Sequence, residues 1–166
     1  MLTSQSDQPT NRPIDHWFAN YSADHRNHGN QAIHVIAVPL ILWSVIAMLW
    51  CVPVPGTWFR PGMWAALAMF LAWMFYYRAS RLIGFGMLAV LVAMAWLTRW
   101  LYDSLGTPGL LRAALVVFVV AWFAQFIGHS KLLEGKRPSF FTDLRYLLIG
   151  PAWLLSKLYR KLGLNW

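Results

Sequence analysis

Four apolar runs, separated by short segments rich in proline, glycine or charge, dominate the pattern of the chain. They cover residues 31–51, 62–77, 82–101 and 110–128. Most approach the ~20 residues that a helix needs to cross a bilayer, and the second is shorter. The connections are a Pro/Gly loop at 52–61, a tight basic connection at 78–81 and a loop around Gly106-Thr-Pro108-Gly109. This pattern predicts four transmembrane helices.

The segments on either side of these runs have a different pattern. Residues 1–12 are polar and predict a disordered N-terminal arm, which leaves 13–166 as a single helical membrane domain. Ile14, Trp17, Phe18 and Tyr21 follow helical spacing, which predicts a short amphipathic helix on the membrane surface with its aromatic face toward lipid. The tail at 142–164 is interrupted at Gly150-Pro151, so we expect C-terminal interfacial or re-entrant helices, and a fifth span stays open.

Composition supports an all-α membrane protein. The chain is 58% hydrophobic and only 12% charged, with a mean hydropathy of +0.46, whereas soluble domains carry roughly 25% charged residues. The net charge of +8 would suggest a nucleic-acid partner in a polar protein. Here the basic residues flank apolar runs, which points to lipid headgroups and not to nucleic acid. The lone Cys51 excludes an intrachain disulfide and a cysteine-cluster metal site.

The distribution of basic residues predicts the orientation of the four spans. Eleven of the fourteen Lys and Arg residues fall on the side that holds both termini and the second connection. These are Arg12, Arg26, Arg78, Arg81, Lys131, Lys136, Arg137, Arg145, Lys157, Arg160 and Lys161. Because basic residues concentrate on the cytoplasmic side, we expect a multi-pass protein of a bacterial inner membrane or the endoplasmic reticulum, with both termini cytoplasmic.

The same topology brings histidines from both ends of the chain to one membrane face. His25, His28 and His34 lie where the N-terminal segment meets the first run, and His129 follows the last run. Neutral imidazole is a common ligand of iron, zinc and copper. His25 and His34 are nine positions apart, about 180° around a continuous helix, so they can share an ion only across a break, which we place at Gly29-Asn30. The alternative is that each histidine is an interfacial residue bonded to headgroups or backbone.

Polar residues near these histidines could orient them. Asn30 precedes His34 by four residues and Gln125 precedes His129 by four, so each pair shares a helical face. Glu134 could ligate the metal only if the helix breaks after Gly128 or Ser130. Otherwise it pairs with Lys136 or Arg137, or orients a histidine.

Two motifs resemble a known family. Tyr21-x3-His25-x4-Asn30-x3-His34-x4-Pro39 resembles the opening signature of the fungal endoplasmic-reticulum 2-hydroxy fatty acid dioxygenases. Trp122-Phe-Ala-Gln125-Phe-Ile-Gly128-His129, then Glu134-x3-Pro138 and Gly150-Pro151, resembles the closing signature. The resemblance implies an iron(II) enzyme of fatty acid α-oxidation that uses O2 to shorten a 2-hydroxy fatty acid by one carbon. It implies His25, His34 and His129 as catalytic iron ligands. Ala37 departs from the pattern, and His28 lies outside it, which leaves an extra ligand open.

A fatty acid substrate fits the physical picture. An acyl chain from one leaflet could slide between helices and bring its carboxylate to the cytoplasmic interface, where a cation should bind it. The candidates are Arg26, Arg81 and Arg137, although each could equally be a topology charge. Tyr21 could contact the oxidised centre or belong to the interfacial aromatic belt. The competing hypothesis is a non-catalytic lipid-binding or scaffold membrane protein. Oligomer formation stays open.

Overall fold

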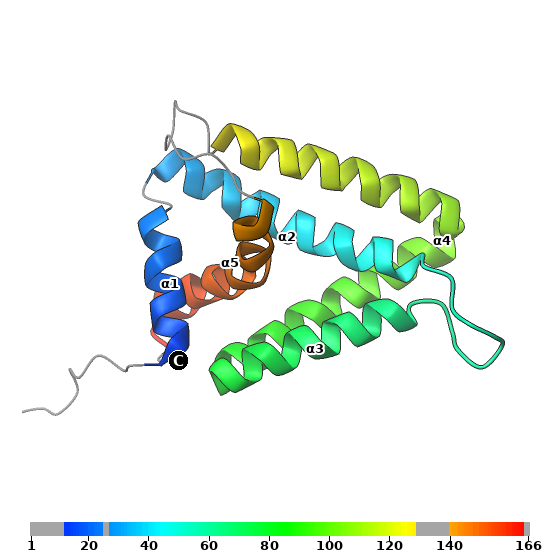
Figure 1. Ribbon diagram of the computed structural model, residues 1–166, viewed down its shortest axis with the longest axis horizontal. Coiled ribbons are helices and arrows are strands. Elements are labelled where there is room, and N and C mark those ends of the chain that lie inside the picture. The colour runs from blue at the N-terminus through cyan, green and yellow to red at the C-terminus, as the bar shows by residue number, and fades with distance from the viewer. Residues whose placement is uncertain (1–11, 25–26, 129–139, 165–166) are drawn as a thin grey trace, which may run out of the picture.

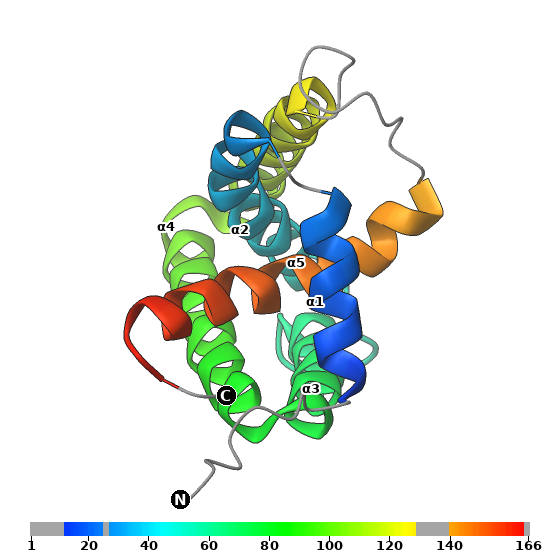
Figure 2. The ribbon, with the colours of Figure 1, turned by 90° about the vertical axis from the view of Figure 1, so that its left-hand side faces the viewer.

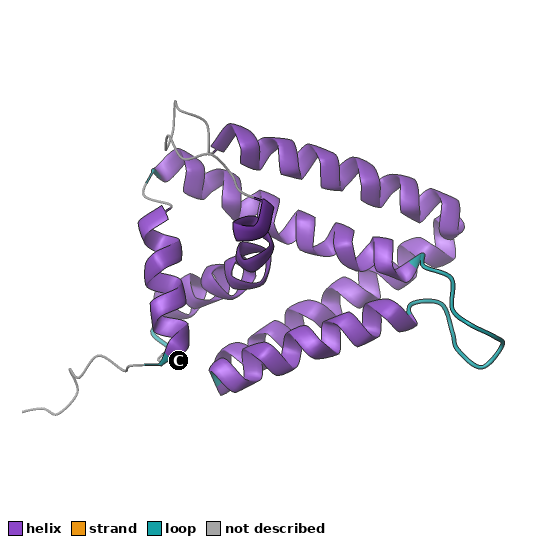
Figure 3. Ribbon diagram, viewed as in Figure 1, coloured by secondary structure: helices purple, strands orange, loops and turns teal. Residues whose placement is uncertain are grey.

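The computed structural model describes residues 12–24, 27–128 and 140–164, and every regular element in these ranges is a helix. Figures 1 and 3 show how the five helices are arranged. They are α1 (Pro13–Asp24), α2 (His28–Trp50), α3 (Met63–Ala79), α4 (Arg81–Gly128) and α5 (Phe140–Lys161). The predicted all-α class is therefore confirmed for this part of the chain.

A sharp turn at Gly106 divides α4 into two arms that run in opposite directions (Figure 1). Gly106 has φ 65° and ψ 176°, a conformation that glycine adopts readily because it lacks a Cβ. Pro108 then lies in the first turn of the second arm, where its missing N–H does little harm. The sequence predicted a loop here, and the structure reduces that loop to this one non-helical residue.

The second arm of α4 packs along α2, and the first arm lies beside α3. Ala47 of α2 clusters with Leu110 and Ala114 near the turn. Further along, Ala37 and Ile41 cluster with Ala121. Small side chains at these contacts let the helix backbones approach closely.

The four long helical segments are antiparallel, so the bundle has two ends. We call one the His34 end: it holds the start of α2, the α3–α4 connection at Ser80 and the last turn of α4 (Figure 1). The other, the Gly106 end, holds that turn and the 51–62 loop. This arrangement agrees with the predicted grouping of the histidine segment, the second connection and the end of the fourth run.

Length and hydropathy differ among the four segments that the sequence predicts to cross a membrane. Within the described residues, two helices are long and apolar enough to span a bilayer: Gly29–Trp50 of α2, and α4. By contrast, α3 has 17 residues, roughly 25 Å at ~1.5 Å per residue, against a hydrocarbon core of ~30 Å. Bulky apolar side chains project outward from α4, among them Val116, Val119 and Val120. Four spans stay a prediction.

The predicted amphipathic helix exists as α1, but its apolar face contacts protein. Ile14, Phe18 and Tyr21 are almost fully buried in the main core cluster. Trp17 stacks on Phe75 of α3, with ring centroids 5.1 Å apart and planes 12° apart. The prediction that this face lies on lipid is therefore wrong, because α3 and α5 offer it an apolar surface within the molecule.

The predicted division of the C-terminal tail into two helices is also wrong. A single helix, α5, continues through Gly150 and Pro151. Proline removes one helical hydrogen bond but often bends a helix without ending it. A Cβ built on Gly150 would lie 3.1 Å from the Tyr21 hydroxyl and 3.2 Å from Val38 Cγ1. The glycine thus lets α5 approach α1 and α2, and this packing stabilises the helix across the proline.

The break between α1 and α2 lies earlier than predicted. The Asn27 side chain accepts a 2.7 Å hydrogen bond from the Gly29 N–H and caps α2, which begins at His28. Gly29 and Asn30 are therefore in the first turn of the helix and do not form the break. Asparagine is a strong N-cap, and the sequence offered Asn27 as well as Asn30.

Candidate functional site

His34 is a buried histidine of α2 whose ring orientation is fixed by the backbone. The side chain is 2% exposed, and Nδ1 lies 3.0 Å from the carbonyl oxygen of Asn30, one turn earlier. A carbonyl can only accept, so Nδ1 carries the proton in this bond, and in the neutral form of this tautomer the lone pair is on Nε2. Metal-ligating histidines typically donate from one ring nitrogen to a carbonyl or carboxylate and bind the metal ion through the other.

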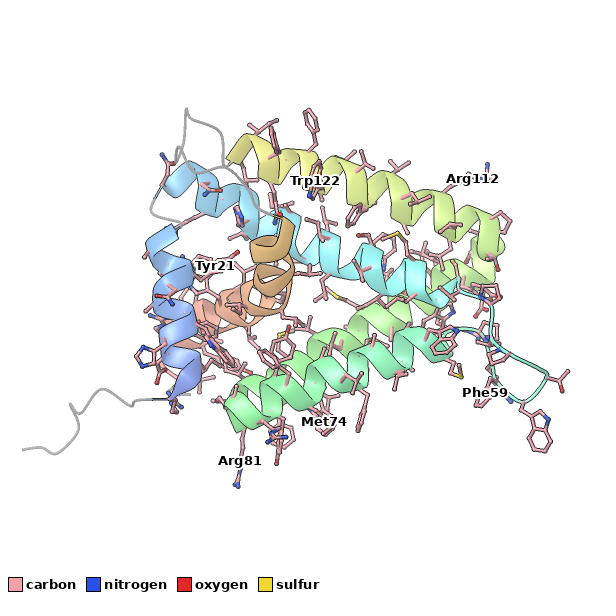
Figure 4. All side chains as sticks on the ribbon, viewed as in Figure 1. Tyr21, Phe59, Met74, Arg81, Arg112 and Trp122 are labelled. Atoms are coloured by element: carbon pink, nitrogen blue, oxygen red, sulfur yellow. The ribbon has the colours of Figure 1, made fainter. Side chains whose placement is uncertain are left out.

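An aromatic ring from α1 covers His34 on one side and is backed by a ring from α5. Tyr21 meets His34 edge to face, with centroids 6.4 Å apart and planes at 78°. The ring centroid of Trp153, on α5, lies 4.9 Å from that of Tyr21. Trp153 Nε1 donates a 2.8 Å hydrogen bond to Ser22 Oγ. Figure 4 shows Tyr21 on α1, facing the space between α2 and α5. These contacts hold an apolar wall beside the imidazole.

Asn30 is the most unusual polar residue in this region. Its side chain is fully buried, and neither Oδ1 nor Nδ2 has a hydrogen-bond partner in the described part of the chain. A buried amide without a partner costs about 1–3 kcal/mol, and a bound ligand is one explanation for retaining such a group. A Cβ built on Gly128 would come within 2.6 Å of Oδ1. The last residue of α4 therefore packs directly on the first turn of α2.

This contact brings two parts of the predicted site together. Gly128 directly precedes His129 in the sequence, and Asn30 precedes His34 by one turn. Figure 2 shows the start of α2 and the end of α4 side by side at the top of the molecule. The predicted partner Gln125 lies half-buried in the last turn of α4. Asn30 does orient His34, but through its backbone carbonyl and not through its side chain.

The remaining predicted ligands and substrate cations are either exposed or outside the described residues. Arg81 is exposed and points away from the bundle at the far corner of the His34 end (Figure 4). The side chain of His28 lies outside the described residues, as do His25, His129, Glu134 and the cations Arg26 and Arg137. Within the ranges that the structure describes, no group of three His, Cys, Asp or Glu side chains could hold a metal ion. Of the three predicted ligands the structure describes His34 alone, and the ligand set stays a prediction.

Lys157 is a residue of this region that sequence reasoning left among the topology charges. Its Nζ donates a 2.8 Å hydrogen bond to Oε1 of Gln31 and lies 3.8 Å above the centroid of the Trp153 ring. Burial lowers the pKa of Lys157, and the positive charge of Arg160 lowers it further. The available signal was the spacing of Trp153 and Lys157, which are four residues apart and share one face of α5.

The arrangement defines the class of protein as an apolar helical bundle with a polar cluster at one end. That cluster combines an oriented imidazole, an amide without a partner and a part-buried cation. The His34, Asn30 and Lys157 side chains come from α2 and α5, and α4 closes the cluster through Gly128. Such a set suits an anionic, hydrogen-bonding ligand with an apolar body.

Comparisons with known proteins give the family. The model of the 2-hydroxy-palmitic acid dioxygenase Mpo1-like family matches residues 11–162, and the chain belongs to this family. It is similar to 2-hydroxy-palmitic acid dioxygenase MPO1 of Saccharomyces cerevisiae, with 28% identity over 147 residues, which cover 86% of this chain and 78% of the yeast protein. No solved structure matches the chain. The predicted resemblance is confirmed.

Proposed function

We propose that this protein is an iron(II)-dependent dioxygenase that shortens 2-hydroxy fatty acids by one carbon with O2. Family membership and the name of the yeast relative support the reaction type and the substrate class. The observation that carries the proposal is the packing of Gly128 on Asn30. This contact joins the helix that bears His34 to the helix that ends one residue before His129.

The proposed iron ligands are His34, His25 and His129. His34 has the tautomer and burial that a ligand needs. His25 and His129 directly follow the last residues of α1 and α4 in the sequence, and His28 and Glu134 stay open as further ligands. Bound iron(II) would supply the redox chemistry with O2 and a template for the substrate oxygens.

The chain itself would orient the substrate and exclude water. The Asn30 carbonyl holds the His34 ring through Nδ1. The Asn30 amide can donate from Nδ2 or accept at Oδ1, which suits a substrate hydroxyl or carboxylate. Tyr21, with Trp153 packed against it, would keep bulk water from one side of the imidazole.

The proposed reaction balances without an external reductant. The C1–C2 bond of the 2-hydroxy acid breaks, C2 becomes the carboxyl carbon of the shortened acid, and C1 leaves as CO2. The substrate loses four electrons and O2 takes up four, so one O2 yields one shortened acid, one CO2 and one water. Consumption of O2 should therefore equal the amount of shortened acid.

The membrane arrangement is part of the proposal. We place all four long helical segments across a membrane, with the His34 end on the cytoplasmic side. Thr57, in the exposed 51–62 loop, and Lys161, at the end of α5, are both accessible. In a Cys51→Ser background, a membrane-impermeant thiol reagent added outside should label Thr57→Cys directly. Lys161→Cys should react only after permeabilisation, and the reverse pattern would contradict this orientation.

Activity is tested by anaerobic reconstitution with iron(II), followed by addition of 2-hydroxypalmitate and O2. Mass spectrometry should detect the acid shortened by one carbon, and palmitate should give no product. If no 2-hydroxy acid of any chain length gives that product, the proposed reaction is wrong. The non-catalytic lipid-binding hypothesis would then gain support.

A further inference from the structure

We propose that Lys157 is the cation that binds the carboxylate of the fatty acid substrate. This inference rests on the proposed function. Lys157 lies on α5 at the His34 end, joined to the first turn of α2 through Gln31, which precedes His34 by three residues. Residues three apart on a helix are surface neighbours, so the ammonium reaches the same corner of the bundle as the imidazole.

The surroundings of Lys157 suit an exchangeable anion. Its ammonium has three donors, and one of them bonds the neutral Gln31 amide oxygen at 2.8 Å. A carboxylate is a stronger acceptor for an ammonium than an amide oxygen, so a substrate could displace Gln31 or join it. The Trp153 ring beneath Nζ holds the cation in place without neutralising it.

The described carboxylates do not neutralise Lys157 either. Asp15 forms an ion pair with Arg12, with Oδ2 and Nε 3.2 Å apart. Asp103 forms one with Arg99, with Oδ2 and Nε 2.8 Å apart. These are the acidic side chains whose positions the structure gives. The pKa of Lys157 is lowered because burial and the positive charge of Arg160 both disfavour its charged form. A bound carboxylate would relieve that penalty.

The contacts around Trp153 connect the cation to the rest of the site. Trp153 lies against Tyr21, and Tyr21 lies against His34. The Trp153 and Tyr21 rings form a continuous wall between the Lys157 ammonium and the His34 imidazole. A 2-hydroxy acid with its carboxylate at Lys157 would carry its 2-hydroxyl on the adjacent carbon, against the same wall of rings.

The test compares an anionic ligand with its neutral ester. Binding of 2-hydroxypalmitate and of methyl 2-hydroxypalmitate to the detergent-purified full chain is measured by competition with a fluorescent fatty acid. The wild type should prefer the acid by about 10- to 100-fold, the range of a charge-assisted hydrogen bond. Lys157→Met should lose that preference, with a much smaller change in the affinity for the ester than for the acid. Lys157→Arg should retain the preference.

The controls separate charge recognition from folding and from general electrostatics. Lys161→Met removes the same charge from an exposed position one turn later on α5 and should keep the acid preference. Lys157→Gln can still bond Gln31 and should lose the preference like Lys157→Met, so it replaces that variant if Lys157→Met does not fold. Acid preference that survives in the folded Lys157 variants, or its absence in the wild type, overturns the inference.

The outcome is distinguishable from that of the proposed reaction. A wild type that binds the acid through Lys157 but gives no shortened product supports the carboxylate site and contradicts the reaction. A wild type that gives the product while Lys157→Met keeps its acid preference contradicts the carboxylate site alone. In steady-state kinetics, Lys157→Met should raise KM for the acid about 10- to 100-fold with a smaller change in kcat.

Discussion

Replacing Asn30 with alanine should make the iron-free protein more stable, which is the opposite of what a buried asparagine usually shows. Both polar atoms of the Asn30 side chain are buried without partners in the described structure. Removing them relieves a desolvation penalty of about 1–3 kcal/mol. The His34 bond survives because it uses the Asn30 backbone carbonyl. Lost packing around the smaller side chain offsets part of the gain.

We therefore expect a net stabilisation of about 1–2 kcal/mol. For a chain of this length, that corresponds to a rise in Tm of about 2–8 °C. The assay is thermal unfolding followed by circular dichroism in detergent, after chelator treatment. Asn20→Ala, at an exposed position of α1, is the matched control. It makes the same chemical change and should gain only the few tenths of a kcal/mol that alanine contributes to helix propensity.

The same variant should lose activity, because the amide is proposed to bond the substrate. Loss of one such bond predicts a decrease of about 10- to 100-fold in kcat/KM. If Asn30→Ala lowers Tm, the amide has a partner in the folded protein and this reasoning fails. If it raises Tm and leaves the activity intact, the amide does not belong to the site.

Three further predictions concern packing, hydrogen bonding and pH. Gly86→Ala should destabilise the protein by about 1–3 kcal/mol, since its Cβ would collide with the Tyr159 hydroxyl. Tyr159→Phe should rescue part of the loss in a double-mutant cycle, and strictly additive effects would refute the collision. Tyr76→Phe should lower stability by about 1 kcal/mol, because its hydroxyl donates a 2.7 Å bond to the Leu148 carbonyl. An unchanged denaturation midpoint would contradict this. For Lys157, burial and the charge of Arg160 hold the folded pKa below the ordinary value of 10.5, so at a pH between these two pKa values the unfolded chain holds a proton that the folded chain has lost. Wild-type stability should therefore rise relative to Lys157→Met as pH increases through that window, and a flat or falling difference would show that the pKa is not lowered.

The sequence predicted the long elements well because their signal is repeated over many residues. The apolar runs became α2, α3 and the two arms of α4, and the stripe from Ile14 to Tyr21 became the buried face of α1. Gly106 and Pro108 marked the reversal, although not how tight it is. The surface against which the apolar stripe of α1 packs could not be predicted from the local sequence, because α3 and α5 form that surface.

The errors occurred where tertiary packing overrides a local signal. Gly150-Pro151 reads as a break, yet the absent side chain of Gly150 is what lets α5 pack on Tyr21 and Val38. Asn27 and Asn30 are equally good caps by residue type, and the structure uses Asn27.

The candidate site was partly accessible from sequence. His34 and Asn30 were identified by spacing, and the convergence of the first and last apolar runs followed from charge distribution. Lys157 was missed because a basic residue near a membrane helix usually indicates topology. Its bond to Gln31 joins residues 126 positions apart, so no local pattern could reveal it.

The most direct test of the iron proposal is the metal content of the purified protein. After reconstitution with iron(II) and gel filtration, elemental analysis should find iron retained in near-stoichiometric amount by the wild type. The exposed-histidine control His16→Ala should retain it equally. His34→Ala and His129→Ala should each lose it while remaining folded by circular dichroism. Full iron retention by folded His34→Ala would contradict a metal centre at this end of the bundle.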